Sequence, residues 1–585
     1  MGYNLPMKLL LATLHAKYVH ASLALPSLAA CCGEIPGVEP VIREYTVNER
    51  TDAILPRLVA EAPDVAAFSC YIWNVEATLR LVADLKLILP GLFVILGGPE
   101  VTFGSSELLS EATQVDCIVR GEGEATFREL VQLLAECSGS AIPDELLETI
   151  CGITFRSDDE IVTTPERPPV ADLNILPSPF AAGLVDTAKP LIYLETSRGC
   201  PFSCAFCISS VEQGVRSFSP ERIERDLAIL MDGGVQTIKL VDRTFNYDPM
   251  RADRIWKFIL ERNRTSRFHF EIAADLLTDD NIRLLATVPP GVFRFEIGVQ
   301  SAHGATLESV GRRSDLERLF ANVARLKRET GVTLHLDLVA GLPGEDFAGF
   351  AASLDRLLTA APHHIQVEPL KVLKGTRMRK IAREHHYAWS PSPPYRILAT
   401  PWLSFTDICR IEAVSHALEL FHNSGRFSAT LAAVARAIPL ATLFTDPAVS
   451  AVIPAGGGNR IPSLFQSLMK LLEAVLSSPL PTGILDALRF DCCMAGHPGP
   501  SLPAFLTGGG EDRGSSAPPI PYVEVAAKLG LAPGERFKTF STTFTRDYTD
   551  PARPEKTSHI IFIYAGSGSG GALHLLRQDA MPGSQ

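Results

Sequence analysis

The feature that most constrains the fold is an alternation of short apolar runs with amphipathic segments, which occurs twice along the chain. The first series lies between residues 8 and 134, and the second between residues 191 and 370. Nearly continuous apolar strands separated by helices predict parallel sheets covered by helices, because parallel strands need long crossover connections. A chain of 585 residues is also too long for one hydrophobic core. The two series therefore predict two α/β domains.

The first series predicts a doubly wound Rossmann-like (flavodoxin-like) domain over residues 1–136. Asn74 is a good N-cap for a helix whose apolar face follows at spacings of three and four, from Val75 through Leu79 and Val82 to Leu85. Helices of this kind between apolar strands are typical of the doubly wound fold. The five strand candidates are KLLLATL (8–14), VIREYTV (41–47), DVAAFSC (64–70), LFVILGG (92–98) and VDCIVRG (115–121).

The second series predicts a partial (β/α)6 TIM-like barrel over residues 190–384. The first of its helices begins at Ser219-Pro220-Glu221, which supplies an N-cap, a proline at the first helical position and an acidic first turn. Between the two domains, residues 137–189 are rich in proline and acidic residues and predict a linker, with a small β element near 151–163. The strand candidates of the barrel are 191–196, 236–241, 268–274, 292–299, 333–340 and 364–370.

Beyond the barrel the strand signals fade. The run SPSPPY (390–395) marks a boundary, and residues 385–565 predict a mainly helical C-terminal extension. The glycine-rich end of the chain predicts a flexible tail over 566–585.

Charge and composition narrow the function. The net charge of −12 argues against nucleic acid as a partner, since that binding needs a basic face. The most apolar stretch, residues 431–450, is broken by Arg436, Pro439 and Asp446, so no membrane span is expected. No secretory signal opens the chain, which predicts a reducing cytoplasmic location rather than a disulfide-bonded scaffold.

Three cysteines lie within eight residues in RGCPFSCAFC (198–207), with the spacing C-x3-C-x2-C and no fourth cysteine nearby. A closed tetrahedral site needs four protein ligands, whereas a catalytic metal site keeps one position open. The loop follows the first predicted barrel strand, at the end where barrel active sites gather. Cys200, Cys204 and Cys207 are thus candidate metal ligands. The alternatives are a zinc knuckle with a distant fourth ligand, or three unrelated thiols.

This loop resembles that of the radical S-adenosylmethionine (SAM) enzymes. The resemblance implies a [4Fe-4S] cluster on the three cysteines, whose open iron chelates the amino and carboxylate groups of SAM. An electron passed through the cluster would cleave SAM to a 5′-deoxyadenosyl radical, and a flavodoxin or ferredoxin would supply that electron. The backbone of Phe206 would lie near the adenine edge of SAM.

Four later segments resemble the same family in the same order. They are LVDRTF (240–245), FEIGVQS (295–301), GRRSD (311–315) and DLVAGLPGED (337–346). The resemblance implies that Asp242 faces the SAM amino group and that Glu296 and Gln300 point toward the ribose or the cluster. Arg312, or Arg313 beside it, would pair with the SAM carboxylate. Each segment alone also fits a structural role, with Glu296 as a buried barrel acid.

The N-terminal domain resembles the cobalamin-binding domain that precedes the barrel in one large radical SAM subgroup. The resemblance rests on Ser69 at the end of the third strand, on Gly97-Gly98 after the fourth, and on RGEGE (120–124) after the fifth. Glycine permits close backbone approach at the carboxyl edge of a parallel sheet. The D-x-H-x-x-G motif is absent, and His20 is the candidate lower cobalt ligand, with a hydrogen-bonding role as its alternative. A flavodoxin-like or nucleotide-binding domain remains the alternative for this region.

Together the resemblances imply a cobalamin-dependent radical SAM enzyme of an uncharacterised branch with a C-terminal extension. The expected activity is methylation of an unactivated carbon of a small-molecule or peptide substrate by means of methylcobalamin. One alternative keeps both cofactors but performs a cyclisation, rearrangement or oxidation. A second alternative is a corrinoid-binding or sensing protein without turnover.

Overall fold

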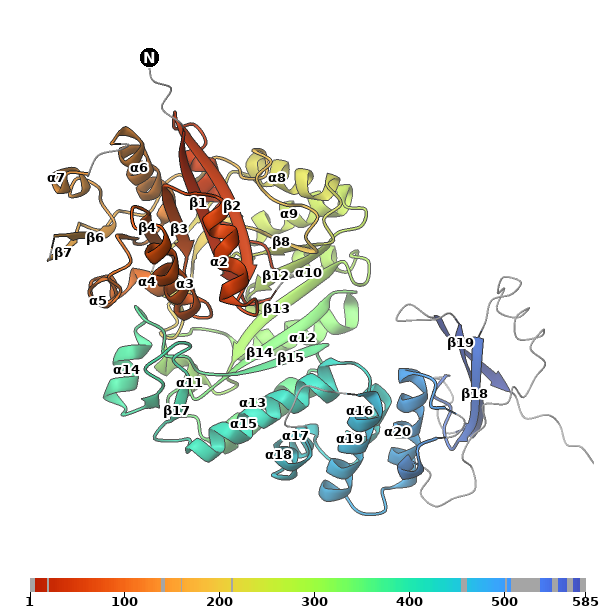
Figure 1. Cartoon of the computed structure of the whole chain (residues 1–585). Helices are drawn as coiled ribbons and strands as arrows, with labels where there is room; N and C mark the ends of the chain where they lie inside the picture. Colours follow the sequence, from red (N-terminus) through yellow and green to blue (C-terminus); the bar gives the residue numbers. More distant parts are fainter. Residues whose placement is uncertain are drawn as a thin grey trace, which may run out of the picture.

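The structure is a computed structural model, in which three parts follow one another along the chain (Figure 1). A sheet domain at the N-terminus is followed by a second sheet with its helices and then by a C-terminal region. The structure describes residues 6–17, 20–137, 142–158, 160–211, 214–453, 460–499, 502–506, 537–549, 556–565 and 572–578.

The N-terminal domain is built on a seven-stranded sheet in the order β2-β1-β3-β4-β5-β6-β7. The first five strands are parallel and follow the flavodoxin-like order 2-1-3-4-5, which confirms the predicted doubly wound domain. Its strands are β1 (Met7–His15), β2 (Val38–Thr46), β3 (Val65–Ser69), β4 (Phe93–Gly97), β5 (Cys117–Val119), β6 (Ile153–Ser157) and β7 (Glu160–Thr163). Its helices are α1 (Ala24–Cys32), α2 (Thr51–Ala60), α3 (Val75–Ile88), α4 (Pro99–Thr102), α5 (Ser105–Glu111), α6 (Gly123–Glu136) and α7 (Asp144–Leu147).

Alternate residues of the strands fill two separate cores, one on each face of this sheet. Leu10 and Phe68 pack on the side of α2 and α3, whereas Leu9 and Leu11 pack on the side of α1 and α6. Strands β6 and β7 lie inside the segment predicted as linker, where a small β element was expected, and they extend the N-terminal sheet as an antiparallel edge. The sheet therefore continues past the predicted boundary at residue 136.

The second sheet has six parallel strands in the order β15-β14-β13-β12-β11-β8. Its edge strands β8 and β15 do not pair in the described part of the chain, so the sheet is an open, partial barrel, as predicted. The strands are β8 (Leu191–Leu194), β11 (Thr237–Leu240), β12 (Arg267–Ile272), β13 (Phe293–Gln300), β14 (Thr333–Ala340) and β15 (His364–Pro369). The helices are α8 (Pro220–Asp232), α9 (Pro249–Arg262), α10 (Asp279–Leu285), α11 (Gly304–Ser309), α12 (Leu316–Glu329) and α13 (Phe347–Thr359).

The two faces of this sheet differ in polarity. One face carries fully buried apolar side chains such as Ile238, Phe270 and Phe295, which pack with the apolar faces of the helices in one core. The alternate residues form the opposite face, called the inner face below, because successive side chains of a strand point to opposite sides. The inner face is defined here by Lys239, His269, Glu271, Glu296, His335 and Asp337, most of which stay partly exposed.

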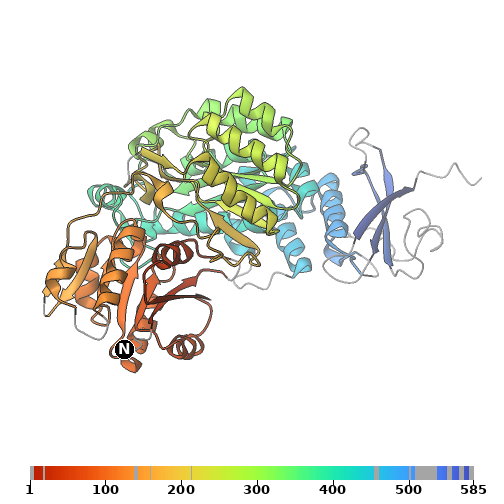
Figure 2. The same cartoon turned by 90° about the horizontal axis from the view of Figure 1, so that it is seen from above.

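The C-terminal region is helical at first, as predicted, but it ends in a sheet that the sequence did not reveal. Strands β18 (Phe537–Phe544), β19 (Ser558–Ala565) and β20 (Ala572–Gln578) are antiparallel, and β20 lies within the predicted tail. Figure 2 shows this sheet beyond α20, at the end of the molecule away from the N-terminal domain. The helices are α14 (Met378–Glu384), α15 (Phe405–Ala417), α16 (Ser428–Val434), α17 (Leu440–Thr445), α18 (Ala448–Val452), α19 (Ile461–Val475) and α20 (Thr482–Ala495), and β16 (Ala388–Trp389) pairs with β17 (Ile397–Ala399).

The stretch between 431 and 450 forms α16 and α17 rather than one long helix. Among the described residues, none of the helices combines the length and the apolar character that crossing a bilayer requires.

Candidate active site

The cysteine loop is held by a short antiparallel hairpin at the carboxyl end of β8. Strand β9 (Ser197–Cys200) pairs with β10 (Gly214–Ser217), and the loop between them carries the other two cysteines. Gly199 has φ +87°, and a Cβ there would lie 2.1 Å from the carbonyl oxygen of Gly214. Only glycine fits this position, because the two backbones approach too closely for any side chain. The hairpin therefore fixes where the loop begins and ends.

Cys200, Cys204 and Cys207 are all free thiols. Cys204 is buried, and its sulfur lies 3.7 Å from a guanidinium nitrogen of Arg312. The sulfur of Cys200 lies 3.4 Å from the hydroxyl of Thr244. Burial raises the pKa of the Cys204 thiol, and Arg312 opposes that shift. A fixed cation beside the most buried thiol fits a negatively charged cluster on this loop.

In the part of the chain that the structure describes, no three His, Cys, Asp or Glu side chains converge on a single metal position. A [4Fe-4S] cluster has a different requirement, because each of its thiolates binds its own iron atom.

Asp242, predicted to face SAM, is fully buried and bound within the protein. Its carboxylate accepts hydrogen bonds from the backbone N–H of Thr196 at 3.2 Å and from the Thr196 hydroxyl at 2.6 Å. Ser197 donates a further short hydrogen bond, and Arg251 lies 3.4 Å away. These contacts tie the end of β11 to the start of the cysteine hairpin. The geometry favours a positioning role for Asp242 over a direct contact with SAM.

Gln300 and Arg312 lie together beside the cysteine loop, whereas Glu296 does not join them. Arg312 donates a hydrogen bond to the carbonyl of Gly298, and the side-chain amide of Gln300 sits against the same glycine. Gln300 has φ +70°, a strained conformation of the kind that clusters at functional sites. Glu296 instead binds Lys239 on the inner face at 3.0 Å. Phe206 is half-buried and packs against the main core.

The residues predicted to bind cobalamin lie at the carboxyl edge of the N-terminal sheet. Ser69 and Gly97 are register partners at the ends of β3 and β4. Gly98 has φ +107°, and a Cβ there would lie 2.6 Å from the carbonyl oxygen of Cys70, so this position requires glycine. At Gly97 the nearest atom to a Cβ would be 3.8 Å away, an ordinary contact.

His20 lies where this edge meets the second sheet. Its Nδ1 shares a short hydrogen bond with the hydroxyl of Tyr193 on β8, and Lys189 donates to its backbone carbonyl at 3.4 Å. Burial lowers the pKa of the His20 imidazole. One ring nitrogen of His20 is thus engaged by the other domain, and its ligation of cobalt stays a prediction.

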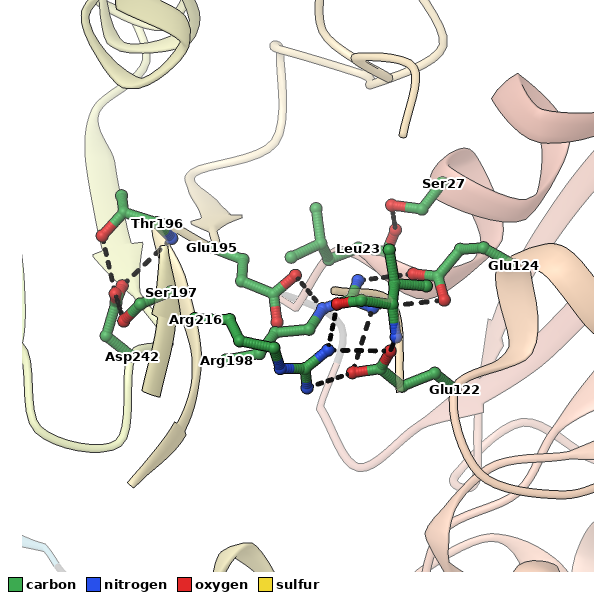
Figure 3. Close-up of polar contacts among 11 residues, drawn as sticks. Leu23, Ser27, Glu122, Glu124, Glu195, Thr196, Ser197, Arg198, Arg216 and Asp242 are labelled. Atoms are coloured by element: carbon green, nitrogen blue, oxygen red, sulfur yellow. Dashed lines mark hydrogen bonds and ion pairs between the residues drawn. The ribbon is translucent and has the colours of Figure 1, made fainter. Parts of the chain in front are cut away.

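A buried ion cluster joins the two domains directly behind the cysteine hairpin (Figure 3). Arg198 on β9 donates to Glu124, at the N-terminus of α6, at 2.5 and 3.3 Å, and to Glu195 at 2.9 Å. Arg216 on β10 binds Glu122 at 2.5 and 3.1 Å. The side chains of Arg198, Glu122 and Glu124 are only 11–15% exposed. Two arginines of one hairpin thus bind two glutamates of the other domain.

This cluster is electrostatically coupled. Burial disfavours the charged form of Arg198, yet Glu195, Glu124 and Glu122 together raise the pKa of its guanidinium. Burial raises the pKa of Glu195 to about 7, although Arg198 opposes that shift. Arg198, only two residues before Cys200, therefore interacts with three carboxylates, of which Glu122 also binds Arg216.

Sequence reasoning singled out the RGEGE segment but not its partners. Arg198 stands inside the quoted cysteine motif, and nothing in the sequence indicates which residues of another domain it contacts. Trp73 was also missed: it follows β3 at the cobalamin edge, stacks on Tyr71 at 4.4 Å and remains 46% exposed. A large apolar side chain left exposed at a ligand-binding edge is available to pack against a ligand.

The residues present fit both expected cofactors. Three free thiols on one loop with Arg312 beside them suit a [4Fe-4S] cluster, while Gln300 and Arg312 are available to SAM. Gly98 and the exposed Trp73 leave the edge of the N-terminal sheet open to a corrinoid.

Comparison with known families matches three segments of the chain. Residues 9–131 match the B12 binding domain, residues 194–357 the radical SAM superfamily, and residues 383–446 a protein of unknown function (DUF4080). The first two matches coincide with the two sheet domains, and the third begins within α14 at the end of the barrel region.

Curated relatives include methyltransferases and cyclases. The chain is 36% identical over 348 residues to an uncharacterized methyltransferase of Pyrococcus horikoshii, covering 57% of this chain and 70% of that protein. It is 25% identical over 385 residues to the cobalamin-dependent radical SAM methyltransferase TokK of Streptomyces tokunonensis, where the match covers 62% of this chain but only 54% of TokK. It is 28% identical over 367 residues to an anaerobic magnesium-protoporphyrin IX monomethyl ester cyclase of Synechocystis, covering 56% of this chain and 68% of that protein.

A solved structure shares the fold. The cobalamin-dependent SAM radical enzyme OxsB, with aqua-cobalamin and SAM bound, superposes with a TM-score of 0.58 at 15% identity. The superposition covers 83% of each chain.

Proposed function

Because this chain belongs to the cobalamin-dependent radical SAM enzymes, with a [4Fe-4S] cluster, SAM and cobalamin as cofactors, we propose that it methylates an unactivated carbon of its substrate. The cluster and SAM supply a 5′-deoxyadenosyl radical, and cobalamin supplies a transferable methyl group. The protein supplies geometry and keeps water from the reacting groups.

One observation carries the proposal: the cobalamin edge of the N-terminal domain meets the inner face next to the cysteine loop. The His20–Tyr193 hydrogen bond and the Arg198–Glu124 ion pair join the two domains at that place. A carbon held on the inner face can then be reached from the SAM side and from the corrinoid side. Such an arrangement suits a reaction that removes a hydrogen atom and delivers a methyl group to the same carbon.

Cys200, Cys204 and Cys207 would hold the cluster, and Arg312 would offset its negative charge from beside Cys204. Gln300 would orient SAM from the end of β13. Glu296 forms an ion pair with Lys239, which argues against its predicted contact with the ribose. Ser69, Gly97 and Gly98 would border the corrinoid at the sheet edge.

The test is an anaerobic assay with reconstituted protein, cobalamin, a strong reductant and methyl-labelled SAM. We expect 5′-deoxyadenosine, S-adenosylhomocysteine and label on the product, since each methylation consumes one SAM as radical source and one as methyl donor. Absence of 5′-deoxyadenosine would remove every radical enzyme activity, including this one. A flavodoxin or ferredoxin is the proposed electron donor.

The second candidate is a reaction without methyl transfer, such as cyclisation, rearrangement or oxidation. It is favoured by the similarity to the Synechocystis cyclase over 367 residues. The same assay separates the two, because this candidate gives 5′-deoxyadenosine and a changed product that carries no label.

A further inference from the structure

The inner face of the six-stranded sheet carries ionisable residues in adjacent rows. Lys239 on β11 is the register partner of His269 on β12. One row further toward the carboxyl ends, Glu271 pairs with Glu296, and Glu296 with His335. Asp337 lies two residues beyond His335 on β14 and therefore on the same face. These residues come from four neighbouring strands, so they form one continuous patch.

Negative charge exceeds fixed positive charge in this patch. Lys239 is its one fixed cation, and it binds Glu271 at 3.3 Å and Glu296 at 3.0 Å. Among the described residues, the ion-pair partner of Asp337 is His335, at 3.0 Å, and Glu296 has His269 beside it at 2.8 Å. Three carboxylates thus face one ammonium group, in a place where their side chains are 18–26% exposed. Partly buried carboxylates without a matching cation are costly to keep ionised.

Other cations near the patch do not neutralise this excess of negative charge. Arg243 and Arg294 influence the pKa values of Glu271 and His269, but in the described part of the chain neither forms a hydrogen bond or an ion pair with a carboxylate of the patch. Burial raises the pKa of both Glu271 and Asp337. Burial also lowers the pKa of His269, although Glu296, 2.8 Å from its Nε2, opposes that shift.

Several polar atoms of the inner face lack a hydrogen-bond partner among the described residues. The side chain of His335 is 9% exposed, and its Nε2 has no partner. Oδ1 of Asp337 lies 3.0 Å from that nitrogen and has no other polar partner among the described residues. Oε1 of Gln300, on the same strand as Glu296, is unsatisfied as well. His335 and Asp337 therefore depend mainly on each other, while the exposed parts of the patch carboxylates remain available to a bound molecule.

The patch lies between the places assigned to the two cofactors. Gln300 and Arg312 beside the cysteine loop stand at its carboxyl end. Tyr193, the register partner of Lys239, carries the hydrogen bond to His20 of the N-terminal domain. A molecule on the patch therefore lies next to both regions.

We propose that the inner face binds the substrate, and that the substrate is hydrophilic and carries a protonated nitrogen, such as an amine or amidine, which binds Asp337 and whose charge Glu271 of the same patch also balances. This inference rests on the proposed function, which places the reacting carbon at the inner face. An anionic substrate would meet three carboxylates, and an apolar one would bury them without partners. A cation at the exposed part of the Asp337 carboxylate balances the charge that Lys239 leaves uncompensated.

The experiment compares three probes with the same four-carbon chain: 1,4-diaminobutane, butyrate and butan-1-ol. Binding to the full-length protein is measured by calorimetry, both as purified and after loading with cluster, cobalamin and SAM. We expect the diamine to bind at least about tenfold more tightly than the other two, because a charge-assisted hydrogen bond contributes more than a neutral contact. Equal binding of the three probes, or failure of the diamine to bind, overturns the proposal.

Variants locate the site. Asp337→Asn and Glu271→Gln should each weaken diamine binding by about tenfold, whereas Asp337→Glu, which keeps the charge, should retain it within about threefold. Glu261→Gln removes an exposed carboxylate on α9 and should change nothing. If Asp337→Asn does not fold, the Glu271→Gln and Asp337→Glu pair carries the comparison. Diamine binding that none of these substitutions weakens overturns the assignment.

The two proposals fail separately. The binding measurement needs no turnover, so loss of 5′-deoxyadenosine formation with intact diamine binding refutes the proposed function alone. Labelled-methyl transfer in a protein that ignores the diamine refutes the cationic substrate alone.

Discussion

The ion pair between Arg198 and Glu124 should contribute measurable coupling between the cobalamin domain and the cysteine hairpin. The perturbation is a double-mutant cycle of Glu124→Gln and Arg198→Gln. Removing one partner of a buried pair costs about 3–5 kcal/mol, because it leaves the other charge uncompensated. Arg198→Gln should lie in this range, since it strands both Glu124 and Glu195.

Glu124→Gln should cost less, because Arg198 keeps Glu195 at 2.9 Å and Glu122 at 3.7 Å. The double variant no longer contains the stranded Glu124 charge, so its destabilisation falls short of the sum of the two single variants. We expect an interaction energy of about 1–3 kcal/mol, as for residues in direct contact.

The assay is hydrogen exchange followed by mass spectrometry on peptides from α6 and from the β9–β10 hairpin. Local opening free energies from both peptides suit a protein of several domains, for which one global unfolding energy is poorly defined. Glu129→Gln is the matched control, since Glu129 lies on the same helix, binds Arg167 instead and is 50% exposed. Two results would refute the reasoning. One is an interaction energy for Glu124 and Arg198 below about 0.5 kcal/mol, and the other is a value equal to the interaction energy measured between Glu129→Gln and Arg198→Gln.

Three further outcomes are expected. Gly98→Ala should destabilise the N-terminal domain by about 1–3 kcal/mol in denaturant unfolding and reduce cobalamin retention, because its Cβ would meet the Cys70 carbonyl at 2.6 Å. Gly97→Ala, whose Cβ would lie 3.8 Å from its nearest neighbour, should leave the unfolding free energy unchanged. Cys204→Ala should abolish the visible absorption of the reconstituted cluster, and Cys409→Ala, at an exposed thiol, should leave it intact. The raised pKa of Glu195, about 7 against 4.5, means that the folded state binds this proton more tightly than the unfolded state. The free energy of unfolding of the wild type should therefore fall by about 3 kcal/mol relative to that of Glu195→Gln as pH rises from 4.5 to above 7. Unfolding free energies that change in parallel with pH in the two proteins would contradict this.

The sequence was sufficient for the strands of both sheets. Each strand predicted from an apolar run, such as 333–340 for β14, appears within a few residues of its predicted position. Apolar runs between amphipathic helices have few other solutions, and the rules for parallel sheets fix most of the topology. The cysteine loop could also be recognised from the sequence, because its three cysteines lie within eight residues.

The C-terminal sheet could not be predicted from the sequence. In β18 the apolar residues Phe537, Phe540 and Phe544 are spaced by three and four, as in a helix, and the residues between β18 and β19 give no turn signal as strong as an Asn-Gly pair. Strand β20 lies in a glycine-rich stretch that indicated a tail. Pairing partners of antiparallel strands that are far apart depend on tertiary contacts. The contact of Asp242 with SAM stays a prediction, and the contacts of Asp242 with Thr196 and Ser197 depend on how β8 and β11 pair.

The ion cluster and the inner face show why the domains have to be considered together. Arg198 belongs to the hairpin that carries Cys200, yet its charge is balanced by Glu124 on the cobalamin domain. Displacing that domain would expose or strand these charges, so the position of the cluster loop depends on docking of the corrinoid edge. The contact of His20 with Tyr193 adds the inner face to the same interface. The interface between the two domains therefore borders the cysteine loop through Arg198 and the inner face through Tyr193.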